Sequence, residues 1–158
     1  MIQNAEVRVR KMTLDDLPAV MAIEQQAFSN PWSLEMVKKE LTQAWSTVLL
    51  CEELTGTGWC LRAFAIFWLV ADELHVLNVA TDTAVRRRGF GRRVMDATLS
   101  FARTQRCVQA FLEVRRSNVA AQGLYGSLGF RQVGLRPRYY QDDHEDAVVM
   151  ALDMKEPA

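Results

Sequence analysis

The segment Arg86–Arg93 has the residue types and the spacing that could bind a polyphosphate. It places five arginines and two glycines in eight residues, directly before a segment with an apolar helical period. Glycine lets the backbone approach a ligand closely, and the free N–H groups at the start of a helix favour anions. Arginine adds fixed charge and paired donors for phosphate. The R-x-x-G-x-G pattern therefore indicates a pyrophosphate site.

Two other interpretations of this segment stay open at this point. It could be a solvated helix start without a ligand, or it could contact nucleic acid, whose phosphates also attract arginine. The chain carries 19 basic and 19 acidic residues, so its net charge of zero does not provide the basic surface of a nucleic-acid-binding domain. No Gly-Lys-Ser/Thr follows, so this is not a Walker loop. We expect a small polyanion and no direct nucleic-acid partner.

A carboxylate and a phenol further along the chain could supply acid–base chemistry. Glu113 is the one charge inside the apolar segment Ala110–Val114. A carboxylate in such a place must find a partner or line a cavity. It is either a catalytic base or a structural carboxylate paired with Arg115 or Arg116. Tyr125, twelve residues later on an expected helix, either donates a proton or packs with its hydroxyl hydrogen-bonded.

Two further features could contact a substrate. Glu24 falls at helical spacing from Val20 and Phe28, which puts a charge on an apolar face. It is either a rim residue that reaches solvent or a contact for a peptide N-terminus or a basic side chain after it. The polar loop Arg138–Asp143, which contains Tyr139, could close over an extended peptide. Its acidic residues would favour a target that contains arginine.

Length and composition predict one domain, residues 1–158. A chain of 158 residues that is 49% hydrophobic can bury one core but hardly two. Three cysteines without C-x-x-C spacing fit a reducing compartment, and two histidines are too few for a histidine metal site, so we expect no metal. The N-terminus lacks a signal-peptide pattern, and the longest apolar run, residues 63–71, cannot span a bilayer as a helix. We expect a cytoplasmic monomer without membrane contact.

These residues must be positioned by a mixed sheet. The apolar patterns predict helices at about 13–28 and 33–41, after the Arg/Gly segment, and from Ser117 or Asn118 to Gly129. Strands are predicted at seven places: Val7–Val9, Thr47–Cys51, Trp59–Val70, Glu73–Thr81, Val108–Val114, Phe130–Gly134 and Ala147–Met154. The order β-α-α-β-β-β-α-β-α-β-β predicts an α+β fold with about seven strands and about four helices on the faces of the sheet.

This order, with Arg86-x-x-Gly89-x-Gly91 between a strand and a helix, resembles the GNAT superfamily of acyl-CoA N-acyltransferases and implies the GNAT fold. Residues 112–130, LEVRRSNVAAQGLYGSLGF, are similar to the bacterial ribosomal-protein-alanine N-acetyltransferase (RimI) group. The F-x-x-P-W-S pattern at 28–33 and the R-Y-Y pattern at 138–140 add to this likeness. The resemblance covers almost the whole chain.

The resemblance implies that acetyl-CoA is the cosubstrate. Backbone groups of the strand end would pair with the pantetheine arm as an added strand, and the Arg/Gly segment would bind the pyrophosphate. The implied contacts are Val79, Ala80, Thr81, Arg87, Arg88, Gly89, Phe90, Gly91, Arg92 and Asn118. Asn118 also fits a plain helix N-cap, and the two roles can coexist. Thr81 stands where the group often has an apolar residue, which a backbone contact tolerates.

The resemblance also implies roles in catalysis. Glu113 would be the base, Tyr125 the acid for the leaving thiolate, and Glu24 and Tyr139 substrate contacts, with direct attack of the amine on the thioester in a ternary complex. The implied substrate is the N-terminal alanine of a small-subunit ribosomal protein. Other protein N-termini, lysine side chains, a small amine or a non-catalytic acyl-CoA-binding module remain alternatives.

Gly123 stands where the group more usually has alanine. A glycine in mid-helix costs about 1 kcal/mol relative to alanine. Gly123 either loosens the turn that aims Tyr125 or lets the cosubstrate approach closely.

Overall fold

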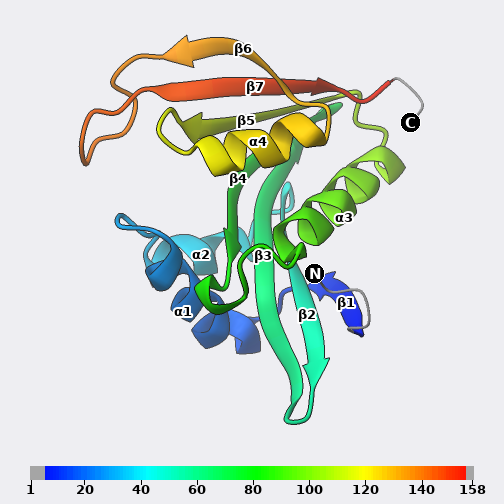
Figure 1. The fold of residues 1–158 in the computed structure, drawn as a ribbon. Coiled ribbons are helices and arrows are strands. Elements are labelled where there is room, and N and C mark those ends of the chain that lie inside the picture. The colour runs from blue at the N-terminus through cyan, green and yellow to red at the C-terminus, as the bar shows by residue number, and fades with distance from the viewer. Residues whose placement is uncertain (1–5, 156–158) are drawn as a thin grey trace.

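A seven-stranded mixed sheet forms the centre of the protein, in the order β1-β2-β3-β4-β5-β7-β6 (Figure 1). The computed structural model describes residues 6–155. Its elements are β1 (Val7–Lys11), α1 (Leu17–Ala27), α2 (Leu34–Glu40), β2 (Ser46–Thr55), β3 (Gly58–Val70), β4 (Glu73–Thr81), α3 (Phe90–Thr104), β5 (Gln109–Arg115), α4 (Val119–Ser127), β6 (Arg131–Arg136) and β7 (Ala147–Asp153). Short 3₁₀ helices at Leu14–Asp16 and Thr83–Val85 precede α1 and α3. The predicted order of elements and the α+β class are confirmed.

Strand β2 is longer than predicted. The expected end was Cys51, and two carboxylates, Glu52 and Glu53, follow it in the sequence. In the structure both carboxylates are paired, Glu52 with Arg10 at 2.8 Å and Glu53 with Arg88 at 2.8 Å. Because arginines compensate these charges, the strand continues to the hairpin turn that connects it to β3.

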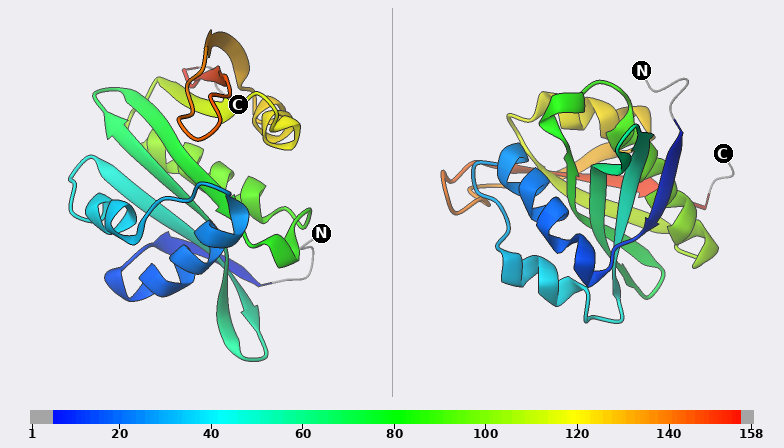
Figure 2. Two further views of the ribbon diagram at one scale, coloured as in Figure 1. Left: turned by 90° about the vertical axis from the view of Figure 1, so that its left-hand side faces the viewer. Right: turned by 90° about the horizontal axis from the view of Figure 1, so that it is seen from below.

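Helices cover both faces of the sheet (Figure 2). On one face α1 and α2 pack against β2–β4, with Val20, Val37 and Phe64 in the core. On the other face α3 and α4 pack over a second cluster that includes Val94 and Leu112. Side chains alternate between the two clusters along β2 and β3, as the pleat requires, and Ala110, Leu112 and Val114 of β5 belong to the second cluster. Glu113 therefore points away from the face that carries its neighbours Leu112 and Val114.

Predicted end signals for the helices occur where expected. The Asp16 carboxylate accepts a hydrogen bond from the Thr13 backbone N–H at 2.8 Å, ahead of α1. The Ser33 hydroxyl accepts one from the Met36 N–H at 3.2 Å and caps α2. Gly129, with φ of 103°, follows the end of α4 in the left-handed conformation. Among residues 6–155, no helix is long and apolar enough to cross a membrane.

Strands β4 and β5 run parallel and then separate. They pair only over Glu73–Val76 and Gln109–Leu112. At Leu77 the register between β3 and β4 shifts by one residue, which is a β-bulge. Beyond it β4 continues beside β3 to Thr81, while β5 continues beside β7 to Arg115. The carboxyl ends of the two strands thus diverge, as Figure 1 shows.

Candidate active site

The separation of β4 and β5 opens a cavity of about 660 Å³. Its walls come from α1 and the α1–α2 loop, β4, β5, the start of α4 and the β6–β7 loop. Five residues predicted for the site line it: Glu24, Val79, Glu113, Asn118 and Tyr125. Other polar residues also line it, among them Asn78, Arg115 and Tyr140. The other predicted contacts are not among its lining residues.

The Glu113 carboxylate is held by two side chains of the C-terminal hairpin. Its Oε1 accepts a hydrogen bond from the Tyr139 hydroxyl at 3.0 Å, and its Oε2 is paired with Arg136 of β6. The partner is thus neither Arg115 nor Arg116, which the structural alternative had named. The side chain is 29% exposed and lies on the cavity wall. Glu113 therefore faces a space that a ligand can enter, and its base role stays a prediction.

Tyr125 lies across the same cavity, on α4. Its ring packs edge-on against Phe130 at 6.0 Å and is 8% exposed. Within residues 6–155 its hydroxyl has no hydrogen-bonding partner, unlike the packed and bonded phenol of the structural alternative. Burial, and to a lesser extent the neighbouring Tyr140, raises the pKa of Tyr125 to about 12. The phenol is therefore protonated at neutral pH and can act as a proton donor.

Glu24 is fully buried, which excludes the alternative of a rim position in contact with solvent. Its Oε1 accepts a hydrogen bond from the Asn78 amide at 2.7 Å, and its Oε2 accepts one from the Trp32 backbone N–H at 2.9 Å. No cationic side chain of the described part of the chain pairs with it. Burial raises the pKa of Glu24, and the two hydrogen bonds oppose this shift. The cavity thus has a buried carboxylate in its wall that no cation compensates.

The two tyrosines of the β6–β7 loop have different positions. Tyr139 is 45% exposed and contacts Glu113 from outside the cavity wall, whereas Tyr140 lines the cavity. Burial raises the pKa of Tyr140 to about 12. The sequence pattern at 138–140 contained both tyrosines, but only the structure shows which of them lines the cavity.

The acidic residues of this loop bind an arginine of the chain itself. Asp142 and Asp143 lie 2.9 and 3.0 Å from the Arg115 guanidinium, and Glu145 lies 3.3 Å from it. The expectation that free carboxylates in the loop favour a target with arginine is weakened, because Arg115 already occupies them.

The Arg/Gly segment forms the entry to α3 beside the end of β4. Gly89 has φ of 88° and precedes the first helical residue, a conformation that favours glycine. A Cβ on Gly91 would lie 3.1 Å from the Thr81 Oγ1, so the helix start approaches the strand end closely. Phe90 is 1% exposed, so any contact it makes with a ligand must come from its backbone.

The arginines of this segment are not equivalent. Arg88 donates to Glu53 of β2 at 2.8 Å and lies over the Phe90 ring at 5.0 Å. Arg92 donates to the Ser127 hydroxyl at 2.8 Å, next to the end of α4. Arg87 is exposed, with φ of 66°. The predicted side-chain contribution of Arg88 to phosphate binding therefore competes with its ion pair.

The strand end and the start of α4 agree with their predicted geometry. Val79 and Ala80 pair with β3 on one edge, and β5 has left the other edge at this point. Such an unpaired edge can accept an extended ligand. The Asn118 Oδ1 accepts a hydrogen bond from the Ala121 N–H at 3.1 Å, so Asn118 caps α4 and also lines the cavity.

Metal and thiol chemistry have little support in the part of the chain from residue 6 to 155. No group of three or more metal-ligating side chains occurs there. His75 accepts or donates a hydrogen bond with Glu73 at 3.0 Å and stacks on Phe111, as a strand residue with a local partner. All three cysteines are free, and burial raises the pKa of both Cys51 and Cys107.

Comparison with known proteins gives a family for this fold and site. Residues 17–130 match the model of the acetyltransferase (GNAT) family. The [ribosomal protein bS18]-alanine N-acetyltransferase of Salmonella typhimurium is 37% identical over 143 residues, which cover 89% of this chain and 93% of that protein. A putative enzyme of the same name from Bacillus subtilis is 31% identical and covers 97% and 99%.

Solved structures agree with this assignment. The ribosomal-protein-S18-alanine N-acetyltransferase of Escherichia coli superimposes with a TM-score of 0.85 at 33% identity and covers 97% of both chains. The NatC complex bound to Gag peptide and CoA shares the fold, with a TM-score of 0.81 at 17% identity. The chain therefore belongs to the GNAT family of acetyltransferases.

Proposed function

We propose that this protein transfers the acetyl group of acetyl-CoA to the α-amine of a protein N-terminus, with the N-terminal alanine of ribosomal protein bS18 as the leading substrate. One observation carries the proposal: Glu113 and Tyr125 line a single cavity at the point where β4 and β5 separate. The Salmonella relative that bears this substrate in its name aligns over most of both chains, which supports the choice of target.

The residues around the cavity fit the parts of acetyl-CoA. At the start of α3, Gly89 is left-handed and Gly91 lies close to Thr81, so two of the residues there have no side chain that could cover the backbone N–H groups. Such a helix start suits a pyrophosphate. The edge of Val79 that β5 leaves suits the amide groups of the pantetheine arm. Acetyl-CoA would supply the acyl group in the activated form of a thioester.

The proposed chemistry is a direct transfer. The amine nitrogen forms a bond to the thioester carbonyl carbon, and the bond from that carbon to sulfur breaks. Glu113 accepts the proton that the amine loses, and Tyr125 donates a proton to the departing thiolate. Transfer of one proton from Glu113 back to Tyr125 through solvent restores both groups. No cysteine of residues 6–155 lines the cavity, which favours this route over an acyl-cysteine.

Glu24 supports an amine as the acceptor. A protein α-amine has a pKa near 8, so most of it arrives as a cation at neutral pH. Glu24 is a buried carboxylate on the cavity wall without a cationic partner in the described chain. Its charge would attract the ammonium group, which must then lose a proton before attack. A target of this kind is made on the ribosome, so we place the activity in the cytoplasm.

Mass spectrometry of peptides incubated with acetyl-CoA tests the proposal. Three acceptors separate the candidate functions: a peptide that begins with alanine, a lysine peptide with a blocked N-terminus, and a free polyamine. We expect acetylation of the first alone. Modification of the lysine or the polyamine would replace the proposed substrate class. Binding of acetyl-CoA in calorimetry without acetylation of any acceptor would indicate a non-catalytic binding module.

A further inference from the structure

Arg115 is the centre of a network that joins three elements around the cavity. It lies on β5, two residues after Glu113 and on the same face of the strand. Its Nη2 donates to both carboxylate oxygens of Asp142 at 2.9 Å, and its Nη1 donates to Asp143 at 3.0 and 3.1 Å. Nη1 also lies 3.3 Å from Glu145. One guanidinium thus holds three carboxylates of the β6–β7 loop.

The same guanidinium also contacts an aromatic residue of the cavity wall, Tyr140. Its central carbon lies 4.0 Å from the centre of the Tyr140 ring, in a cation–π contact. Tyr140 lines the cavity, and its ring packs edge-on at 5.1 Å against Tyr139, whose hydroxyl donates to Glu113. The positions of both tyrosines, and one hydrogen bond of Glu113, therefore depend on the loop that Arg115 holds.

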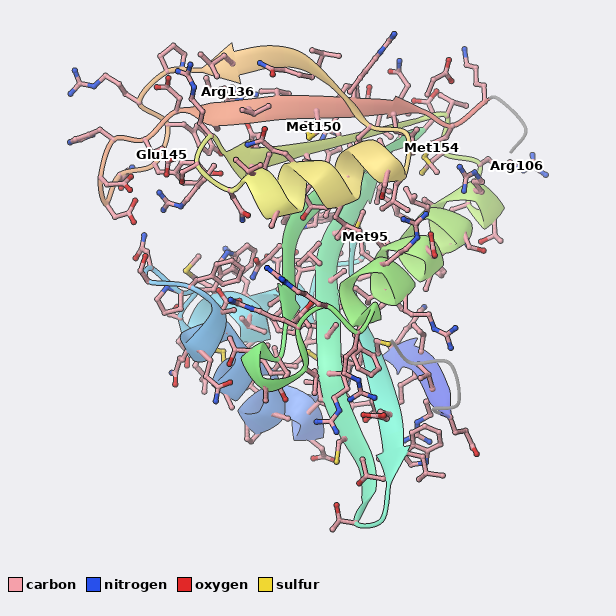
Figure 3. All side chains as sticks on the ribbon, viewed as in Figure 1. Met95, Arg106, Arg136, Glu145, Met150 and Met154 are labelled. Atoms are coloured by element: carbon pink, nitrogen blue, oxygen red, sulfur yellow. The ribbon has the colours of Figure 1, made fainter. Side chains whose placement is uncertain are left out.

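Glu145 extends the network to α4. Its Oε1 contacts Arg115, and its Oε2 accepts a hydrogen bond from the Ser117 backbone N–H at 2.7 Å. Ser117 directly precedes Asn118, the cap of the helix that carries Tyr125. Figure 3 shows Glu145 at the β6–β7 loop, beside the connection from β5 to α4. The loop is thus tied both to the strand of the predicted base and to the start of the helix of the predicted acid.

We propose that Arg115 is a positioning residue for the acceptor: it fixes the β6–β7 loop, residues 137–146, as the wall against which the acceptor peptide binds. This inference rests on the proposed function. Arg115 itself needs no contact with the reacting atoms, because it acts through Tyr140 and through the Tyr139–Glu113 hydrogen bond. Its removal affects acceptor binding before it affects binding of acetyl-CoA, because the predicted contacts of acetyl-CoA other than Asn118 lie at the end of β4 and around the start of α3.

The geometry calls for arginine in particular. A planar guanidinium presents two donor edges to Asp142 and Asp143 while its face stacks on Tyr140. A lysine ammonium carries the same charge but can neither fork between the two carboxylates nor stack in this way. A lysine at this position therefore keeps the positive charge but loses the paired contacts with Asp142 and Asp143 and the stacking on Tyr140.

The neighbouring Arg116 provides a matched control. It has the same charge one residue along and pairs with Asp146 of the same loop at 3.3 Å. Its side chain is 69% exposed, against 27% for Arg115, so its single ion pair contributes little. If any basic residue paired with the loop could hold the acceptor wall, loss of Arg116 would raise the acceptor KM as much as loss of Arg115.

Steady-state kinetics of Arg115→Gln, Arg115→Lys and Arg116→Gln, with an alanine-first peptide, test the proposal. We expect both Arg115 variants to raise the acceptor KM about tenfold or more, since small misplacement of a binding wall is costly. Their calorimetric Kd for acetyl-CoA stays at the wild-type value, and Arg116→Gln resembles wild type. Hydrogen–deuterium exchange in residues 137–146 increases in the Arg115 variants alone.

The double variant Asp142→Asn/Asp143→Asn weakens the same network from the loop side and serves if the Arg115 variants fail to fold. It should raise the acceptor KM in the same way. An unchanged acceptor KM in a folded variant, or full rescue by Arg115→Lys, would overturn the proposal while the proposed function stands. If wild-type protein acetylates no N-terminal peptide, the proposed function fails first and the inference falls with it.

Discussion

The Arg88 guanidinium lies 2.8 Å from the Glu53 carboxylate, so one arginine of the segment predicted to bind pyrophosphate is paired with strand β2. Arg62 of β3 lies 2.8 Å from the same carboxylate. Hydrogen bonding to Arg88, and less strongly to Arg62, lowers the pKa of Glu53 and keeps it ionised. This ion pair connects the segment before α3 to the sheet. Because the Arg88 side chain is already paired with Glu53, we expect it to contribute little to phosphate binding.

Removal of Arg88 should therefore affect stability more than ligand binding. We expect Arg88→Gln to lower the free energy of unfolding by about 1 kcal/mol, as for a partly exposed ion pair. Arg87→Gln, at an exposed position, should instead weaken acetyl-CoA binding about tenfold through a lost charge-assisted contact. Denaturant titration and calorimetry measure the two effects. Equal loss of affinity in both variants, without loss of stability, would contradict this division.

Glu113→Gln should depress turnover while acetyl-CoA still binds. A general base contributes about 10²–10⁴ in rate, so we expect kcat to fall by that order. The amide retains an oxygen that can accept from Tyr139, so the fold and the Kd for acetyl-CoA should not change. Stopped assays at neutral pH together with calorimetry give both numbers. Wild-type turnover in this variant would remove Glu113 from the mechanism.

Tyr125→Phe should lower kcat about a hundredfold by removal of the proton donor for the thiolate. Because burial holds the pKa of Tyr125 at about 12, its phenol remains protonated up to about pH 10. Any alkaline decline of wild-type kcat below that pH must therefore come from another group. A pH–rate profile of both proteins measures this, with Tyr139→Phe as a comparison that keeps the aromatic ring beside Glu113. An unaltered kcat in Tyr125→Phe would assign the phenol to packing alone.

Asp16 should contribute stability that depends on pH. Arg10 holds its carboxylate at 2.7 and 2.8 Å and lowers the pKa of Asp16 to about 2. A carboxyl group with a depressed pKa stabilises the fold above its ordinary value of about 4 and loses that contribution as pH falls toward 2. We expect Asp16→Asn to cost about 1 kcal/mol at pH 7 and little at pH 2. Denaturant melts at the two pH values decide; an equal loss at both would assign the effect to the cap with Thr13.

Gly123→Ala should stabilise α4. A Cβ at this position meets no atom within 4 Å, and the helical backbone suits alanine. We expect a gain of about 0.5–1 kcal/mol in thermal or chemical melts. Unchanged KM for acetyl-CoA would indicate that the glycine only loosens the helix, whereas a raised KM would indicate close approach of the ligand. Gly91→Ala is the contrast, because its Cβ would lie 3.1 Å from the Thr81 Oγ1.

Local pattern was enough for most of the elements and for the glycine that follows α4. Strand β4 has the predicted bounds, Glu73–Thr81, because its apolar residues alternate with others and the Arg/Gly segment follows it closely. Gly129 adopts the left-handed conformation that its place after α4 suggested. These features depend on neighbours in the sequence, so the sequence reveals them.

Partners far along the chain were beyond the reach of such patterns. Arg136 lies beyond the predicted strand Phe130–Gly134, and nothing around it indicated a contact with Glu113, 23 residues away. Arg115 was one of two candidate partners for Glu113, yet it binds the β6–β7 loop. Asn78, the polar residue amid the apolar strand β4, was visible in the sequence, but its partner Glu24 lies on α1. Long-range ion pairs follow from tertiary packing, which no local period encodes.

The parting of β4 and β5 also divides the backbone hydrogen-bonding of the sheet. Among residues 6–155, four residue pairs, Glu73–Val76 with Gln109–Leu112, connect the ladder of β1–β4 to that of β5–β7. The backbone hydrogen bonds of the sheet thus form two ladders joined by a short parallel segment, and either ladder can open without breaking the hydrogen bonds of the other. A ligand that contacts both β4 and β5 across the cavity binds only when the two ladders are together. Its binding free energy therefore stabilises the protein against opening of either ladder.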